Sequence, residues 1–478
     1  MVTLLAALIW IAFLCLIAVI YWYVTIPKNL PPGPVGLPFV GSYLSLANGR
    51  TQDSVLQSYV KKYGPLFKVY IGNKLVIILG DYDTIYEAFV KRGDDFTGRV
   101  QFLGAGPEKL NYKGIIQSEG PLWKEQRRFA LSTLRDLGLG RPVLKPQVKE
   151  QVENLIANMS EQKGAFDPLK LLFYYVSTVI FGLVYGNRPM DSRDKLVRTF
   201  LELFDNFTDS GIGTLSPMIK LRKIIDQFFS LLEQELEETK KLFELNVEPE
   251  NFTHAFMKAA QDRQGESFFV DDQLLASVVD LFMAGTNTTT MRLNWAILFL
   301  CHNPEIQDKM YQEIQDQVGT SVLPNYADRT KLPFTEAVLM EVHRLANLSP
   351  LGVLRRTVAA TKLMGYDIPA DAAIAPLLTN VLHNPQYYPD PLKFDPYRFL
   401  DDNGKFVRDQ KVIPFQLGKR ACIGESLARM EIFLFVTGLV SRLRLSFPSD
   451  RPLPTLKPLG GSANIPRPYK ICVEARTD

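Results

Sequence analysis

The sequence predicts a mainly α-helical protein with small β-sheets, an α+β fold in which one large domain follows an apolar N-terminal helix. Three observations lead to this fold class. Helix-length apolar or amphipathic segments dominate residues 121–345, two β-rich runs flank a Gly-Asn turn near the start, and no linker or repeat divides the chain. With 46% hydrophobic and 22% charged residues, the 478-residue chain has the composition of an ordinary globular protein.

Charge and cysteine content argue against two classes of function. The formal net charge of +3 is too small to indicate nucleic-acid binding. The four cysteines Cys15, Cys301, Cys422 and Cys472 are widely spaced, which indicates no disulfide framework and suits a reducing compartment. No second Cys or His lies within metal-ligand spacing of Cys422, so a zinc site is disfavoured.

Residues 1–26 form the first predicted element, a transmembrane signal-anchor helix. The segment from Val2 to Val24 is almost wholly apolar, and as a helix it would span roughly 34 Å, enough to cross a bilayer. Lys28 and later basic residues follow this segment and none precedes it, which places the body of the protein in the cytoplasm. The alternative is a cleaved signal peptide, but the segment lacks a basic start and a small-residue cleavage site.

Residues 27–41 are predicted to be a proline-rich hinge, and residues 42–478 a single catalytic domain. Prolines stiffen the hinge and prevent the preceding helix from continuing. Within the domain, the β-rich runs 66–71 and 74–79 predict a hairpin around Gly72-Asn73. Short strands and turns are expected at 352–415, and the clearest helices are expected at 121–134, 146–158, 219–245, 271–301 and 304–318.

Cys422 is the most informative residue, because it lies between a glycine-rich loop and an apolar helical segment at 425–443. The positive end of that helix dipole, together with Lys419 and Arg420, should favour the thiolate over the thiol. Glycines such as Gly424 allow a flat ligand to approach the backbone closely. A thiolate held in this way is a good axial ligand for haem iron, whereas the simpler interpretation is a buried structural cysteine.

This loop resembles the cysteine-loop signature of the cytochrome P-450 family, with Phe415, Gly418, Arg420, Cys422 and Gly424 in the matching positions. The resemblance extends from the anchor to the C-terminus, and it is strongest to the microsomal animal family-2 type. It implies the cytochrome P-450 fold, a single haem-containing catalytic domain, haem b as the cofactor and Cys422 as the axial ligand of the iron. Phe415 and Gly424 would then lie against the cofactor.

The middle of the long helix, from Met283 to Thr290, resembles the oxygen-activation helix of the same family. Ala284 and Thr288 share one face, and Ala284 with Gly285 would leave room for a small diatomic ligand. The resemblance implies that Thr288 hydrogen-bonds iron-bound oxygen and helps to deliver protons. Asn287 stands where the family has an acid, so proton delivery is expected to be slower, to follow another route or to release peroxide. A packing face of small residues is the alternative interpretation.

Glu341 and Arg344 are three residues apart on one predicted helix, where an ordinary surface ion pair is the simplest interpretation. Together with Arg398, they resemble the buried Glu–Arg–Arg triad of the family. Two guanidinium groups on one carboxylate would lock two distant segments together and support the cysteine loop.

Haem carries two propionates, and the resemblance assigns their binding to an indole and three guanidinium groups. Trp123 and Arg127 lie one helical turn apart, and a solvated surface charge is the alternative for each arginine. The propionate candidates are Trp123, Arg127, Arg99 and Arg355, and Arg420 is a further basic residue that the family places near the haem. A further set of basic residues would attract an acidic reductase, with scattered solubilising charge as the alternative: Lys124, Arg128, Arg135, Lys411 and Lys419.

The resemblance implies a haem-thiolate monooxygenase that inserts one oxygen atom from O2 into a xenobiotic, fatty acid or eicosanoid. Electrons would come from NADPH through a flavoprotein reductase, with cytochrome b5 as a further candidate donor. The chain would be single-pass in the endoplasmic reticulum membrane, with its catalytic domain cytoplasmic. Membrane lipids and a lipophilic substrate are expected partners and nucleic acid is not. Candidate substrate contacts, with core packing as the alternative for each, are Phe102, Leu103, Phe204, Phe207, Leu351, Val353 and Ile465.

Two other functions remain open at this point. The first is an O2-independent haem-thiolate isomerase or dehydratase of oxygenated lipids, to which Asn287 gives weight. The second is a non-catalytic, membrane-tethered haem sensor. Product formation that depends on NADPH and a reductase would separate the monooxygenase from both.

Overall fold

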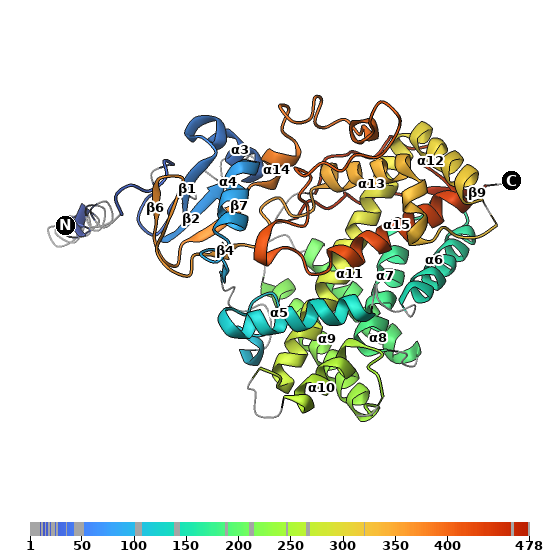
Figure 1. Cartoon of the computed structure of the whole chain (residues 1–478), viewed down its shortest axis with the longest axis horizontal. Coiled ribbons are helices and arrows are strands. Elements are labelled where there is room, and N and C mark those ends of the chain that lie inside the picture. The colour runs from blue at the N-terminus through green and yellow to red at the C-terminus, as the bar shows by residue number, and fades with distance from the viewer. Residues whose placement is uncertain are drawn as a thin grey trace.

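The computed structural model describes most of the chain from Pro27 onward (Figure 1). The described residues are 10, 13–14, 16–17, 20, 24, 27–34, 36–42, 52–100, 108–137, 144–186, 190–209, 215–244, 247–263, 268–319, 321–459 and 463–476, with side chains left out at 52, 109, 144, 192, 204–209 and 215–221. The predicted anchor at 1–26 lies mostly outside these residues. Among the residues that are described, no helix is both long and apolar enough to cross a bilayer.

The main sheet lies at the end of the molecule from which the N-terminus extends (Figure 1). Its strand order is β1-β2-β7-β4-β3, and β2 runs parallel to β7 while the other neighbours are antiparallel. The strands are β1 Leu66–Ile71, β2 Lys74–Leu79, β3 Gly98–Arg99, β4 Arg355–Arg356 and β7 Ala373–Pro376. The predicted hairpin is confirmed, and Gly72 in its turn has a φ of +58°, which favours glycine.

Two smaller antiparallel sheets complete the β structure of the described residues. Strands β5 Thr361–Leu363 and β6 Tyr366–Ile368 form the first, and β8 Leu443–Ser446 and β9 Cys472–Ala475 form the second. The short strands β4 to β7 all fall in the segment 352–415, where short strands and turns were expected.

Helices make up most of the rest of the molecule, so the predicted fold class of mainly α with small β-sheets is confirmed (Figure 1). They are α3 Gln52–Tyr63, α4 Tyr82–Tyr86, α5 Gly120–Arg135, α6 Leu144–Ser160, α7 Leu169–Tyr185, α8 Met190–Asp209, α9 Leu215–Lys241, α10 Phe252–Asp262, α11 Asp271–His302, α12 Pro304–Gln317, α13 Pro333–Ala346, α14 Leu378–Leu382 and α15 Glu425–Arg442.

The five helices expected between 121 and 318 are confirmed as α5, α6, α9, α11 and α12. The largest difference is α9, which begins and ends four residues earlier than predicted. It begins earlier because a proline two residues after Leu215 is tolerated in a first helical turn. It ends earlier because Leu242 and Phe243 donate to carbonyls three residues back, which tightens the last turn.

Helix α11 is the central element of the apolar core and is largely buried along its length. It packs against α7 on one side and α15 on another. Leu293 and Ile297 of α11 meet Val436 and Leu439 of α15 at the second of these interfaces. This packing fixes the helix that follows Cys422 against the helix that carries Thr288.

Candidate functional site

The cysteine loop is held in a tight backbone conformation between β7 and α15. The Cys422 N–H donates to the carbonyl of Phe415 at 2.9 Å, which closes the loop. Gly418 has a φ of +73°, and a Cβ at this position would lie 1.7 Å from the carbonyl oxygen of Phe89. Only glycine therefore allows the loop to pass over the π-helical turn Glu87–Lys91.

Cys422 is a free thiol whose side chain is solvent-accessible although protein surrounds it closely. Burial raises its pKa, and the Glu425 carboxylate adds to this increase, whereas the Gly424 N–H and the Arg127 guanidinium lower it. The expectation that its surroundings favour the thiolate is wrong for the protein by itself, because desolvation outweighs the favourable contacts.

The basic residues expected to act on the sulfur are engaged elsewhere. Lys419 forms an ion pair with Asp94. Arg420 donates to the carbonyls of Thr97 at 2.8 Å and Ser118 at 2.6 Å. Arg127, which donates to the carbonyl of Ala421 at 2.7 Å, is the guanidinium that acts on the Cys422 thiol.

Buried guanidinium groups gather beside this loop. Arg99 and Arg355 lie directly opposite each other in the β3–β4 ladder, an arrangement that is unfavourable for two like charges. Burial, together with nearby arginines, lowers the pKa of Arg99 to about 10 and that of Arg420 to about 8. Burial and the nearby arginines also lower the pKa of Arg355 well below its usual range. The cluster therefore holds more positive charge than buried protein normally tolerates without a counter-ion.

Several donors in this cluster have no partner among the residues that the structure describes. Nε and Nη1 of Arg355 are buried and unpaired, while its Nη2 donates to the carbonyl of Leu417 at 2.8 Å. The indole N–H of Trp123 is also buried and unpaired, and its ring lies 3.9 Å from the guanidinium carbon of Arg420. Buried charged donors without partners indicate an anionic ligand with several acceptor oxygens, and the two propionates of a haem have this chemistry.

Glu119, which sequence reasoning missed, is an acid at the edge of this cluster. It lies at the N-cap position of α5, accepts from the backbone N–H of Arg99, and forms an ion pair with Arg356. Its position just before Gly120-Pro121, a helix-start pattern, was the available signal. Although Glu119 is acidic, it accepts no hydrogen bond from the unpaired atoms of Arg355 and Trp123. Among the described residues, those atoms therefore still lack an acceptor.

The predicted oxygen side of the site is the middle of α11. Ala284 and Thr288 are both solvent-accessible within a largely buried helix, and the Thr288 hydroxyl donates to the Ala284 carbonyl at 2.8 Å. Gly285 does not open this face, because a Cβ there would lie 2.8 Å from Ile180 of α7. Its lack of a side chain permits helix packing, so the expected room beside it is supplied by Ala284 alone. The Asn287 side-chain oxygen is buried and unpaired.

Asp280, two turns before Thr288, is another acid that sequence reasoning missed. One of its carboxylate oxygens accepts from the backbone N–H groups of Ile115 at 2.7 Å and Ile116 at 2.8 Å. Burial raises its pKa to about 6, against the opposing effect of these two hydrogen bonds. Asp280 thus ties the segment after residue 108 to α11, and a lone acid in an apolar helix was the signal that could have identified it.

The structure brings Glu341, Arg344 and Arg398 together. Glu341 and Arg344 are fully buried, and the guanidinium donates to both carboxylate oxygens, at 2.6 and 2.7 Å. Nε of Arg398 lies 3.5 Å from Glu341, whose carboxylate also accepts from the Asp395 N–H at 3.0 Å. Helix α13 is therefore joined to the segment that leads toward the cysteine loop.

The candidate substrate contacts are not assembled by the described residues. Phe102 and Leu103 lie outside them, as do the side chains of Phe204 and Phe207. Leu351 packs against the β1–β2–β7 cluster, Ile465 packs against the main core, and Val353 is exposed. Their role in binding substrate stays a prediction.

The outer face of α5 carries three of the predicted basic surface residues. Lys124, Arg128 and Arg135 are exposed, while Trp123 of the same helix is buried. Glu125 pairs with Arg128 at 2.8 Å, and Asp136 lies beside Arg135. Of the remaining two, Lys419 pairs with Asp94, and the Lys411 ammonium lies over the rings of Tyr82 and Tyr387.

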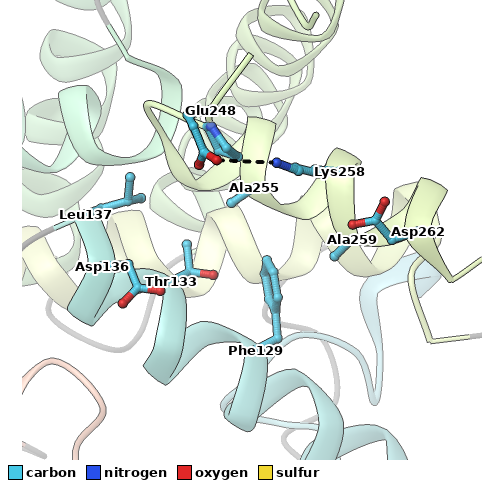
Figure 2. Close-up of a pocket in the computed structure, with 10 residues that line it drawn as sticks. Phe129, Thr133, Asp136, Leu137, Glu248, Ala255, Lys258, Ala259 and Asp262 are labelled. Atoms are coloured by element: carbon cyan, nitrogen blue, oxygen red, sulfur yellow. Dashed lines mark ion pairs between the residues drawn. The ribbon is translucent and has the colours of Figure 1, made fainter. Parts of the chain in front are cut away.

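A cavity of about 250 Å³ lies near the far end of α5, between that helix and α10 (Figure 2). Phe129 and Thr133 of α5 and Ala255 of α10 line it, and Lys258 lies 3.9 Å from Glu248 at its edge. None of the predicted site residues lines this cavity, so it does not belong to the arginine and cysteine cluster.

Comparisons with known proteins bear on the whole chain. The family model described as Cytochrome P450 matches residues 31–473. Cytochrome P450 2H2 of Gallus gallus is 35% identical over 461 residues, which cover 92% of each chain. Cytochrome P450 2G1 of Oryctolagus cuniculus is 35% identical, with 98% of each chain covered. Cytochrome P450 2D26 of Rattus norvegicus is 34% identical, covering 97% of this chain and 96% of its own.

Proposed function

Because the chain belongs to the cytochrome P450 family, it is a haem-thiolate monooxygenase, and we propose that it oxidises lipophilic small molecules at the endoplasmic reticulum membrane. Haem b, bound through a cysteine thiolate, supplies the redox chemistry that cleaves O2 and inserts one oxygen atom into the substrate. The residues of this chain bind that cofactor, orient the substrate and handle protons.

We infer that Cys422 is the axial ligand and that the arginine cluster beside it binds the propionates. The observation that carries this assignment is the set of buried, unpaired donors on Trp123 and Arg355. Arg99, Arg127 and Arg420 would add positive charge around the carboxylates. Phe415 and Gly424 would lie against the ring.

On the oxygen side, we propose that Thr288 positions a proton at its hydroxyl. In the structure this hydroxyl donates to the Ala284 carbonyl, so it is poised to exchange that partner for a ligand on the accessible face. Asn287 can orient water through its amide but has no proton to release near neutral pH. Proton delivery is therefore expected to be slower, to follow another route or to release peroxide.

The triad of Glu341, Arg344 and Arg398 has a supporting role in this proposal. Arg344 also donates to the carbonyls of Leu382 and Pro391, each at 2.7 Å. One guanidinium thus holds α13, the end of α14 and the chain beyond it in a fixed arrangement. That arrangement supports the loop that presents Cys422.

The proposal includes a membrane location and an electron partner. Residues 1–26 would anchor the chain, and the exposed basic face of α5 would meet an acidic NADPH-dependent flavoprotein reductase, with cytochrome b5 as a second donor. A membrane location suits a xenobiotic, fatty acid or eicosanoid as the substrate. Deleting residues 1–27 should release much of the protein from vesicles, and continued tight binding would show that another surface is the main contact.

The test is reconstitution of the full-length protein in lipid vesicles with the reductase and a panel of fatty acids and foreign lipophiles. Binding is read first from the spin-state change of the iron, and product formation is then measured with NADPH, the reductase or O2 omitted in turn. Product must require all three. Turnover of a lipid hydroperoxide without NADPH, and no NADPH-dependent product, would select the isomerase instead.

A further inference from the structure

The cavity between α5 and α10 is formed by two helix faces that leave space between them (Figure 2). Phe129 and Thr133 lie one turn apart on α5, and Ala255 and Ala259 lie one turn apart on α10. Because alanine side chains are short, the two helices meet here without filling the space, which has a volume of about 250 Å³. A cavity of this size suits a ligand of about ten non-hydrogen atoms, smaller than a drug-sized molecule.

The floor of this cavity is apolar and aromatic. Phe129 is buried, and its ring packs edge-on against three further phenylalanine rings at centroid distances of 5.4 to 5.6 Å, those of Phe252, Phe256 and Phe269. One cation already lies against this aromatic cluster, because the guanidinium carbon of Arg263 is 4.9 Å from the centre of the Phe269 ring. The Phe129 ring therefore offers a ligand an apolar surface that also tolerates positive charge.

Thr133 supplies a polar group inside the cavity. This residue is 7% exposed, and its hydroxyl makes no hydrogen bond with another residue that the structure describes. In Figure 2 the hydroxyl points into the space between Phe129 and Ala255. A nearly buried hydroxyl directed into a cavity normally finds its partner there, and its oxygen can accept a hydrogen bond from an N–H group of a ligand.

The rim of the cavity is acidic. It carries three carboxylates, which belong to Asp136 after α5, Glu248 before α10 and Asp262 in the last turn of α10. The one basic side chain in the lining is Lys258, whose ammonium group lies 3.9 Å from Glu248. Asp262 is exposed and forms no ion pair with a described residue. The lining thus holds more carboxylates than ammonium groups, which favours a cationic ligand.

We propose that this cavity is a second ligand site, which binds a small protonated amine with an apolar body. The apolar body lies on Phe129 and against the two alanines of α10. The ammonium group lies between the Thr133 hydroxyl and the carboxylates of the rim, to which it donates hydrogen bonds. A neutral molecule of the same shape loses the charge-assisted bonds, and an anion is repelled. The site is separate from the proposed haem and substrate sites, so the inference does not depend on the monooxygenase function.

The test is binding of 2-(4-fluorophenyl)ethylamine to the full-length holoenzyme, followed by fluorine NMR of the ligand. The neutral alcohol of the same shape, 2-(4-fluorophenyl)ethanol, is the matched control compound. The amine should bind about tenfold more tightly than the alcohol, because only the amine makes charge-assisted hydrogen bonds. Added salt should weaken binding of the amine and leave that of the alcohol unchanged. The visible spectrum of the haem is recorded on the same samples, since an amine bound to the iron would shift it.

Variants of the lining separate this cavity from any other place where an amine could bind. Ala255→Leu fills the space and should abolish binding, and Thr133→Val should weaken binding of the amine several-fold. Asp262→Asn should weaken it about threefold, since the rim charge is screened by solvent, and Lys258→Gln should strengthen it by about the same factor. Asp226→Asn removes an exposed carboxylate of α9 that does not line the cavity, and it should bind as wild type.

Opposite effects of Asp262→Asn and Lys258→Gln would support the proposal, because a general loss of structure would weaken binding in both. These two variants also decide the matter if Ala255→Leu fails to fold. Equal affinity for the amine and the alcohol, or affinity that no variant of the lining changes, would overturn the proposal. So would binding that always comes with a shift of the haem spectrum, since the ligand would then be at the iron. Absence of NADPH-dependent product would instead overturn the proposed function and leave the binding result intact.

Discussion

Replacing Glu341 by Gln should strongly destabilise the protein, although the side chain keeps its size. Arg344 is fully buried and Arg398 is 10% exposed, and both guanidinium groups would lose the carboxylate that they share. Removing one partner of a buried ion pair costs about 3–5 kcal/mol. The remaining amide oxygen can still accept one hydrogen bond, which places the expected loss near the lower end, about 3 kcal/mol.

The assay is urea unfolding of the solubilised holoprotein, followed by tryptophan fluorescence and by the haem spectrum. Asp226→Asn is the matched control, because Asp226 and Arg222 are also one turn apart but are 60% and 59% exposed. That variant should lose less than about 0.5 kcal/mol. Adding Arg344→Met to Glu341→Gln should recover part of the loss, because it removes an unpaired buried charge. Equal losses in Glu341→Gln and Asp226→Asn would refute the reasoning.

Four further predictions concern the cofactor site. Cys422→Ser should abolish the thiolate-type, red-shifted spectrum of the reduced carbon monoxide complex, and an unchanged spectrum would disprove the ligand assignment. Loading haem into the apoprotein near pH 7 should release about one proton in wild type and fewer in Cys422→Ser, as measured with a pH indicator in weak buffer. The reason is that burial raises the pKa of the thiol, which must lose its proton to bind iron. Trp123→Phe should weaken haem retention about tenfold in transfer assays, because it removes an unpaired buried donor, and equal retention would show that the indole N–H binds no propionate. Thr288→Ala should raise peroxide release relative to product, and unaltered coupling would remove its proton-delivery role.

Local elements were largely predictable from the sequence. The hairpin at β1–β2 follows from alternating β-rich runs around Gly72, and helix α11 follows from a capping acid at Asp271 and a proline just beyond its end. Helix α10 was not predicted because its apolar pattern is short, although Asn251 caps it by accepting from the His254 N–H. Pairing of β2 with β7 could not be derived, because nearly 300 residues separate the two strands.

The sequence predicted which residues form the site, but it did not predict how their charges act on one another. The spacing around Cys422 and the order of the basic residues identified the loop and its neighbours. The sequence predicted that the surroundings of Cys422 lower the pKa of its thiol, whereas in the structure they raise it. The prediction was wrong because Lys419 pairs with Asp94 and Arg420 donates to a backbone carbonyl, and neither orientation can be read from the sequence. Gly285 was assigned to the wrong face of α11 for the same reason, since helical periodicity does not say which neighbour packs there.

The sequence by itself determined that this chain presents a cysteine before an apolar helix, in the spacing of one family, because those residues lie within a single short segment. Tertiary structure decided which charges reach one another. Arg99 and Arg355 meet only because β3 pairs with β4, and Arg127 reaches the carbonyl of Ala421 only because α5 lies beside the cysteine loop. Burial, which shifts the pKa of each of these ionisable groups, is a property of the packed chain as a whole.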